Sequence, residues 1–209
     1  MSKFSLVVAT LLALATFPMT GCGNGQDRSE KTARTSALVA VDVTTAKQNL
    51  DQVVTGLKNV RDASDSADLK KLYGDLQAPT GQLKTSLVHV QATSERAIAA
   101  GKAQNDEWHK QADTFTDPDL RNSSSKRQND LRGAVDALVV SNTTLKSVSD
   151  PYLAQLDQSL KALDLDLTQQ GLQATKPSVS RLIDDEAKLR DTLNDMAAKN
   201  KAVNSVINP

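Results

Sequence analysis

Residues 39–60 read VAVDVTTAKQNLDQVVTGLKNV, and their apolar side chains recur at alternating intervals of three and four positions. Because an α-helix turns once every 3.6 residues, this spacing aligns them in one stripe along one helix face. Such a stripe is typical of a helix that lies lengthwise against another helix. Its members are Val39, Val43, Ala46, Leu50, Val53, Leu57 and Val60. The Ser- and Asp-rich cluster at 62–68 predicts the end of this helix.

The same alternation continues in three further stripes along the chain. The second stripe is Leu69, Leu72, Leu76, Leu83, Leu87, Val90, Ser94, Ala97, Gly101, Gln104 and Trp108. The third is Leu131, Val135, Leu138, Asn142, Leu145, Ser149, Tyr152, Leu156, Ser159, Leu163 and Leu167. The fourth is Leu182, Glu186, Leu189, Leu193, Met196, Asn200, Val203 and Ile207. Asp117 and Pro118 predict the start of the third helix, as an N-cap followed by a proline at the first helical position.

These stripes predict an all-α fold, an elongated antiparallel four-helix bundle over residues 37–209 whose two long central helices form a coiled-coil hairpin. At 1.5 Å per residue, each central helix reaches roughly 60–75 Å. Pro79 predicts a kink or a displaced start in the second helix, and Pro151 predicts a bend in the third. The segment from Gly171 through Pro177 is expected to be the turn before the fourth helix.

Polar residues interrupt the stripes at several positions, and two interpretations of them stay open. They are Ser94, Gln104, Asn142, Ser149, Glu186 and Asn200. Polar groups in a helical seam fix the register of the helices at some cost in stability, and that is the interpretation we favour. Contacts with a partner are the alternative.

The first 21 residues have the pattern of an export signal. Lys3 gives a positive start, residues 4–15 are almost entirely apolar, and small residues follow Pro18. The apolar run is shorter than the roughly 20 residues of a membrane-spanning helix, which favours a cleaved signal peptide. Residues 19–22 resemble the bacterial lipobox, which implies acylation of Cys22, the only cysteine. An ordinary secretory signal and an uncleaved signal anchor are the alternatives.

The residues after Cys22 bear on where the protein is held. Acyl chains add about 0.8 kcal/mol of membrane affinity per buried methylene, so a lipidated Cys22 anchors the protein to a bilayer. By resemblance to lipoprotein sorting in bacteria with two membranes, an Asp directly after the acylated cysteine would favour retention in the inner membrane. Gly23 stands at that position, which indicates an outer-membrane lipoprotein facing the periplasm. Residues 22–36 contain scarcely an apolar side chain, and we expect a flexible tether there.

Charge and residue types exclude several function classes. The chain has 25 Lys and Arg against 25 Asp and Glu, so it lacks the positive field with which proteins bind nucleic acid. His89 and His109 belong to no cluster with metal-ligand spacing, and Asp106 with His109 has the pattern of a surface pair. No acidic pair stands out as a general acid and base. We therefore expect no metal, no cofactor and no enzymatic activity.

Trp108 and Phe115 lie near the tip of the predicted hairpin, and Trp108 is the only tryptophan. One interpretation is an aromatic anchor for a partner, because tryptophan is enriched at binding hot spots. The other is a cap over the end of a thin core. Leu165 alternates with Asp164 and Asp166, which predicts that it points away from the main stripe toward a second neighbour. Leu165 is thus a third candidate contact, which includes self-association of the rod into a dimer.

Three groups of residues carry a resemblance to a known family. They are Asp106, Glu107 and Trp108, then Leu120 and Arg121, then Asp150, Pro151 and Leu153, followed by regularly spaced leucines. From about Val39 onward the chain resembles the bacterial domain-of-unknown-function family numbered twenty-nine fifty-nine. The resemblance implies an exported, helical protein that forms coiled coils, and it implies no activity.

Two functions from different classes remain open. The first is an envelope lipoprotein that acts as a non-catalytic helical scaffold or protein-interaction module, in contact with the membrane through its lipid and with an unknown envelope protein. The second is a periplasmic helical bundle that binds a small ligand. The second predicts an enclosed cavity lined by convergent polar groups.

Overall fold

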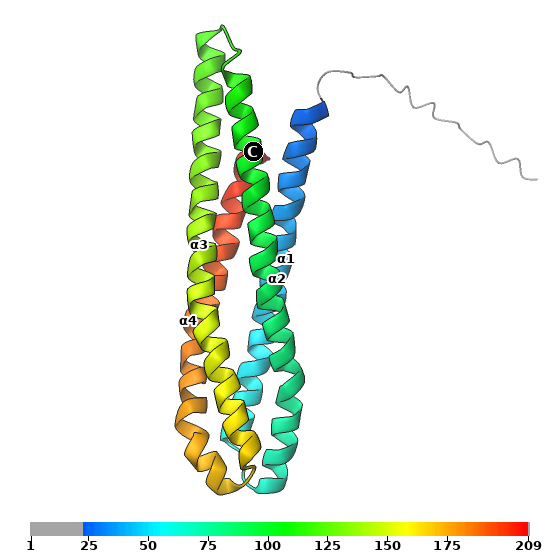
Figure 1. The fold of residues 1–209 in the computed structure, drawn as a ribbon, viewed down its shortest axis with the longest axis vertical. Helices are drawn as coiled ribbons and strands as arrows, with labels where there is room; N and C mark the ends of the chain where they lie inside the picture. The colour runs from blue at the N-terminus through cyan, green and yellow to red at the C-terminus, as the bar shows by residue number, and fades with distance from the viewer. Residues whose placement is uncertain (1–22, 209) are drawn as a thin grey trace, which may run out of the picture.

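The computed structural model describes residues 23–208, which form four long helices joined by three short turns (Figure 1). The helices are α1 (Gly23–Arg61), α2 (Ser66–Ala112), α3 (Pro118–Leu165) and α4 (Gln169–Ile207). α1 and α4 have 39 residues each, whereas α2 has 47 and α3 has 48. The predicted all-α bundle with two longer central helices is confirmed, and the predicted N-cap at Asp117 is also confirmed.

The four helices pack as a closed ring around one core. α1 and α3 each pack against both α2 and α4, and consecutive helices run in opposite directions (Figure 1). The aliphatic residues of the predicted stripes are buried, except for Leu72 and Leu167, which are partly buried against the same core. Full burial of one such side chain contributes about 1.5–3 kcal/mol, so the stripes together hold the ring closed.

Three prolines lie inside helices that continue through them, at Pro79, Pro151 and Pro177. The displaced start predicted at Pro79 is therefore wrong, as α2 begins at Ser66. A proline leaves the carbonyl four residues earlier without its helical donor. Those carbonyls belong to three exposed residues, Asp75, Ser147 and Gln173. Water can therefore satisfy them, and packing of the opposite face keeps each helix intact.

The prediction of a flexible tether is wrong for residues 23–36, which form the first turns of α1. Thr32 and Ser36 are 0% and 2% exposed, so small polar side chains are buried here in place of aliphatic ones. Ser36 Oγ donates to Asn200 Oδ1 (2.9 Å), and Asn200 Nδ2 donates to the Ser36 carbonyl (2.7 Å). These bonds to α4 supply the fixed contacts that an apolar stripe supplies elsewhere. Cys22 lies outside the described residues.

The turn expected at 171–177 instead lies at 166–168, and α4 starts at Gln169. Thr168 is the N-cap and accepts from the Gly171 amide (3.3 Å). Glycine is needed at 171 because of space: a Cβ there would lie 2.1 Å from the Asp166 carbonyl oxygen. Gly171, which suggested a turn in the sequence, is therefore required by the close approach of its backbone to the backbone of Asp166.

Gly171→Ala is expected to lower the free energy of unfolding by about 1–3 kcal/mol, the usual cost of forcing extra atoms into a packed site. Gly133→Ala is the matched control, because a Cβ at Gly133 would meet no atom within 4 Å among the described residues. That control should stabilise the helix by about 0.5–1 kcal/mol. Urea denaturation followed by circular dichroism measures both. Equal effects of the two substitutions would contradict the close approach at Gly171.

Candidate functional site

The turn between α2 and α3 is held by contacts on both of its sides. Asp117 accepts hydrogen bonds from the backbone amides of Asp119 (2.8 Å) and Leu120 (3.3 Å), which start α3. Arg121 Nε donates to the Phe115 carbonyl (3.2 Å). The backbone that carries Phe115 is thus tied to the first turn of α3, and the two helices end in an ordered tip.

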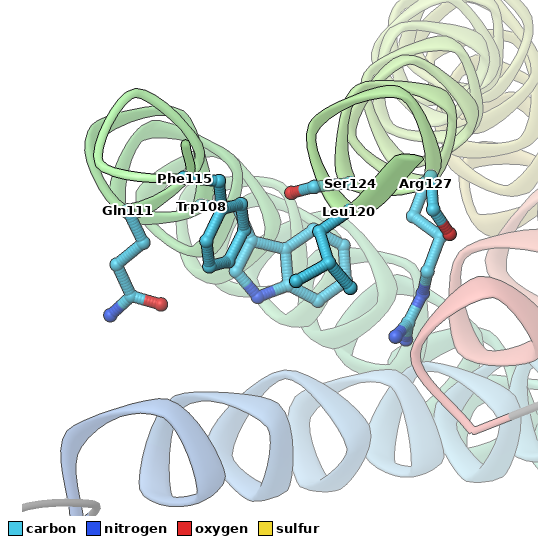
Figure 2. A pocket seen from close by; sticks show the side chains of 7 residues that line it. Trp108, Gln111, Phe115, Leu120, Ser124 and Arg127 are labelled. Atoms are coloured by element: carbon cyan, nitrogen blue, oxygen red, sulfur yellow. The ribbon is translucent and has the colours of Figure 1, made fainter. Parts of the chain in front are cut away.

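A hollow of about 290 Å³ lies at this tip, on the side that faces the start of α1 (Figure 2). Seven residues from the last turns of α2, the turn and the first turns of α3 line it. They are Trp108, Gln111, Phe115, Leu120, Ser123, Ser124 and Arg127. Two of the three candidate contact residues from the sequence, Trp108 and Phe115, therefore share one surface.

The Trp108 side chain has two neighbours of different kinds. It is partly buried and packs against the end of the hydrophobic core. The guanidinium carbon of Arg127, from α3, lies 5.0 Å from the centre of the Trp108 ring, within the range of a cation–π interaction. Trp108 therefore covers the end of the core and also forms a wall of the hollow.

Leu120 belongs to this surface although no stripe predicted it. It is 57% exposed and points into the hollow beside Trp108 (Figure 2). No apolar stripe in the sequence includes Leu120. It is a leucine in the first turn of α3, before the stripe that begins at Leu131. A large apolar side chain that a helix does not use for its own core is a candidate for an external contact.

Leu165, the third candidate, lies at the opposite end of the bundle as the last residue of α3. It is 81% exposed, so the expectation that it packs against a second neighbour within the bundle is wrong. At this end the side chain of Gln169, the first residue of α4, donates to the carbonyl of Ala63 (3.4 Å) in the turn between α1 and α2.

Most polar stripe residues bond to another helix of the bundle. Besides the Ser36–Asn200 pair, Gln104 Nε2 donates to Ser29 Oγ (2.8 Å) and Ser94 Oγ donates to Met196 Sδ (3.4 Å). Arg190 bridges Glu186 on its own helix and Asp51 on α1, and the hydrogen bond to Asp51 is the main reason that the pKa of Arg190 is raised. These contacts favour the register interpretation.

The side-chain oxygens of Asn142 and Gln104 are buried and accept no hydrogen bond from the described residues.

A second hollow, of about 200 Å³, lies between α3 and α4 beside Tyr152. The Tyr152 hydroxyl and the Gln155 amide nitrogen are buried and find no hydrogen-bond partner among residues 23–208. Burial raises the pKa of the Tyr152 phenol, and the charges of Glu186 and Asp185 raise it further, so the group stays a protonated donor at neutral pH.

Two features are absent from the described residues. No group of three or more His, Cys, Asp or Glu side chains in residues 23–208 is arranged to hold a metal ion. Among the four helices described, none combines the length and apolar character required to span a bilayer.

Comparison with known proteins gives a family match. The model of a family described as "Protein of unknown function (DUF2959)" matches residues 32–208. Searches of curated proteins and of solved structures find no match.

Tyr152→Phe is expected to leave the free energy of unfolding unchanged or to raise it by up to about 1 kcal/mol. The reason is that the substitution removes a buried hydroxyl that makes no hydrogen bond within the described chain and keeps the ring that packs in the core. Thermal melting at neutral pH measures the change. A loss of more than about 1 kcal/mol would show that the hydroxyl has a bound partner.

Proposed function

Because the chain belongs to the DUF2959 family, whose description assigns no activity, we propose its function from its geometry: a non-catalytic, lipid-anchored helical rod of the cell envelope that acts as a scaffold through surface contacts. The anchor is an acylated Cys22, and the compartment is the periplasmic face of the outer membrane. The long axis follows from α2 and α3, whose 47 and 48 residues extend about 70 Å.

The observation that carries this proposal is the composition of the tip hollow. Of its seven lining residues, Trp108, Phe115 and Leu120 are large and apolar, and Arg127 is the one that carries charge. Acid–base or nucleophilic catalysis requires titratable groups that converge on one point. Tryptophan and arginine are instead among the residues enriched at the centre of binding interfaces. The surface therefore suits contact and not chemistry.

Binding of a small ligand is the second candidate, and one observation favours it. The hollow beside Tyr152 offers two buried donors, the Tyr152 hydroxyl and the Gln155 amide, with Lys188 at its edge. These groups suit a small neutral hydrogen-bond acceptor such as a carbonyl oxygen, because Asp185 also lines the hollow and its charge opposes an anion. Destabilisation by Tyr152→Phe in protein isolated from its envelope would support this candidate over the first.

The anchor predicts that growing cells incorporate radiolabelled palmitate into the wild-type protein and not into Cys22→Ala. Acylation requires the Cys22 thiol, the only thiol in the chain, so the substitution should abolish the label completely. Ser2→Ala, a change outside the lipobox, is the control and should keep the label. Equal labelling of wild type and Cys22→Ala, or no label in either, ends the lipoprotein proposal.

The contact surface is tested with a photoreactive amino acid placed at Leu120 or at Val140. Both are exposed apolar positions of α3, at 57% and 66%, but Val140 lies on the shaft of the rod. Illumination of intact cells is expected to give a crosslinked product from position 120 and none from position 140, as resolved by mass spectrometry. Products from both positions in equal yield, or from neither, would contradict a dedicated tip surface.

A further inference from the structure

At the end of the bundle that carries the α2–α3 tip, α4 stops short of the hairpin (Figure 1). Ser141 on α3 donates to Asp195 on α4 (2.7 Å), so these two residues lie at the same height. The two helices are antiparallel, and the last residue of α4, Ile207, is therefore level with about Asn129 of α3. Beyond this height α3 continues to Pro118, over roughly 11 residues or 16 Å.

α1 reaches farther toward the tip than α4 does. Arg28 Nη2 is 3.6 Å from Glu107 Oε1, and Gln104 Nε2 donates to Ser29 Oγ (2.8 Å), so the first turns of α1 run beside the last turns of α2. Lower in the bundle α4 lies between α1 and α3 and packs against both. At the height of the tip hollow, that place between α1 and α3 has no helix from residues 23–208.

The α3 residues that border this place continue the face that packs against α4. Ser141, Val148 and Gln155 follow one another at intervals of seven residues; Ser141 bonds to α4, and the other two line the hollow between α3 and α4. Positions seven residues apart point the same way in a helical bundle. Two and three such intervals before Ser141 lie Arg127 and Leu120, which line the tip hollow (Figure 2). The hollow is therefore bordered by the surface of α3 that α4 covers farther down.

The side chains of the hollow define what kind of helix fits there. Trp108, Phe115 and Leu120 provide apolar area toward the tip. Arg127 lies toward the end of α4, stacks on Trp108, and forms no ion pair with a carboxylate of residues 23–208. Leu120 and Arg127 are seven residues apart, which is about two helical turns. A complementary helix therefore presents aliphatic side chains and, about two turns away on the same face, one carboxylate.

We propose that the tip hollow binds one amphipathic helix of a partner protein, which lies in line with α4 beyond Ile207 and pairs a carboxylate with Arg127. The inference rests on the proposed contact function and names the kind of partner. Two features support a helix as the occupant. α1 and α3 already hold a helix between them along the rest of the bundle, and the α4-facing surface of α3 continues into the hollow.

The single tryptophan reports on this contact. The probe is a stapled peptide helix that carries leucines along one face and one glutamate on that face, about two turns from the leucine nearest the tip. A twin peptide has lysine in place of the glutamate. Titration of the purified protein with the glutamate peptide is expected to shift Trp108 emission to shorter wavelength and to saturate, because the ring loses contact with water. The lysine peptide should bind about tenfold more weakly, because it meets a like charge at Arg127.

Arg127→Glu should reverse this preference, so that the lysine peptide binds about tenfold more tightly than the glutamate peptide. Arg132→Glu is the matched control, since it makes the same change at an exposed arginine of α3 outside the hollow, and it should keep the wild-type preference. Fluorescence anisotropy of labelled peptides measures the affinities. Circular dichroism of both variants checks that they keep the wild-type helix content.

Reversal by Arg127→Glu and not by Arg132→Glu supports the inference. Equal affinity of the two peptides for the wild type overturns it, because the charge of Arg127 then plays no part. Absence of saturable binding also overturns it. A crosslink from position 120 in intact cells would in that case leave the contact function standing without a helix in the hollow, whereas loss of the crosslink as well would overturn both. Purified protein that sediments as a dimer, which Arg127→Glu disrupts, assigns the hollow to a second copy and overturns the partner helix.

Discussion

The packing of aliphatic side chains along the axis of the bundle holds every other feature in place. Each of the four helices presents a stripe that becomes stable only when two neighbours cover it, which closes the ring of α1, α2, α3 and α4. This packing keeps α2, α3 and α4 helical through Pro79, Pro151 and Pro177, although an internal proline costs a helix about 3 kcal/mol. Burial of one or two leucines offsets each of these costs.

Aliphatic stripes can slide along one another, and polar pairs are what distinguish one alignment from the next. The Ser36–Asn200 pair fits one register of α1 against α4, because a shift by one turn would leave both polar groups buried without partners. Gln104 with Ser29 does the same for α1 against α2. These pairs lie toward the end where the helices differ in length, so they also define the position of the hairpin tip relative to α1.

The unequal helix lengths give this protein a surface that an even bundle would lack. At the tip the core is narrow. Trp108 packs against the end of the core and also lines the hollow. The turn brings Phe115 and Leu120 to the same place from opposite sides of the chain reversal. The opposite end has short turns and no comparable aromatic cluster among the described residues. The two ends of the bundle therefore present different side chains to an external contact.

The sequence by itself determined the helices, their core faces and their antiparallel order, because the spacing of apolar residues is a local property of each segment. It also singled out Trp108 and Phe115. It did not determine that residues 23–36 are helical, that Gly171 lies within α4, or that Leu120 completes the tip surface. Those features depend on how far one helix extends past another, and on buried serines and threonines that resemble loop residues until a neighbour satisfies them. Only the assembled bundle brings such residues together, since the relative register of helices is a property of their contacts and not of any one segment.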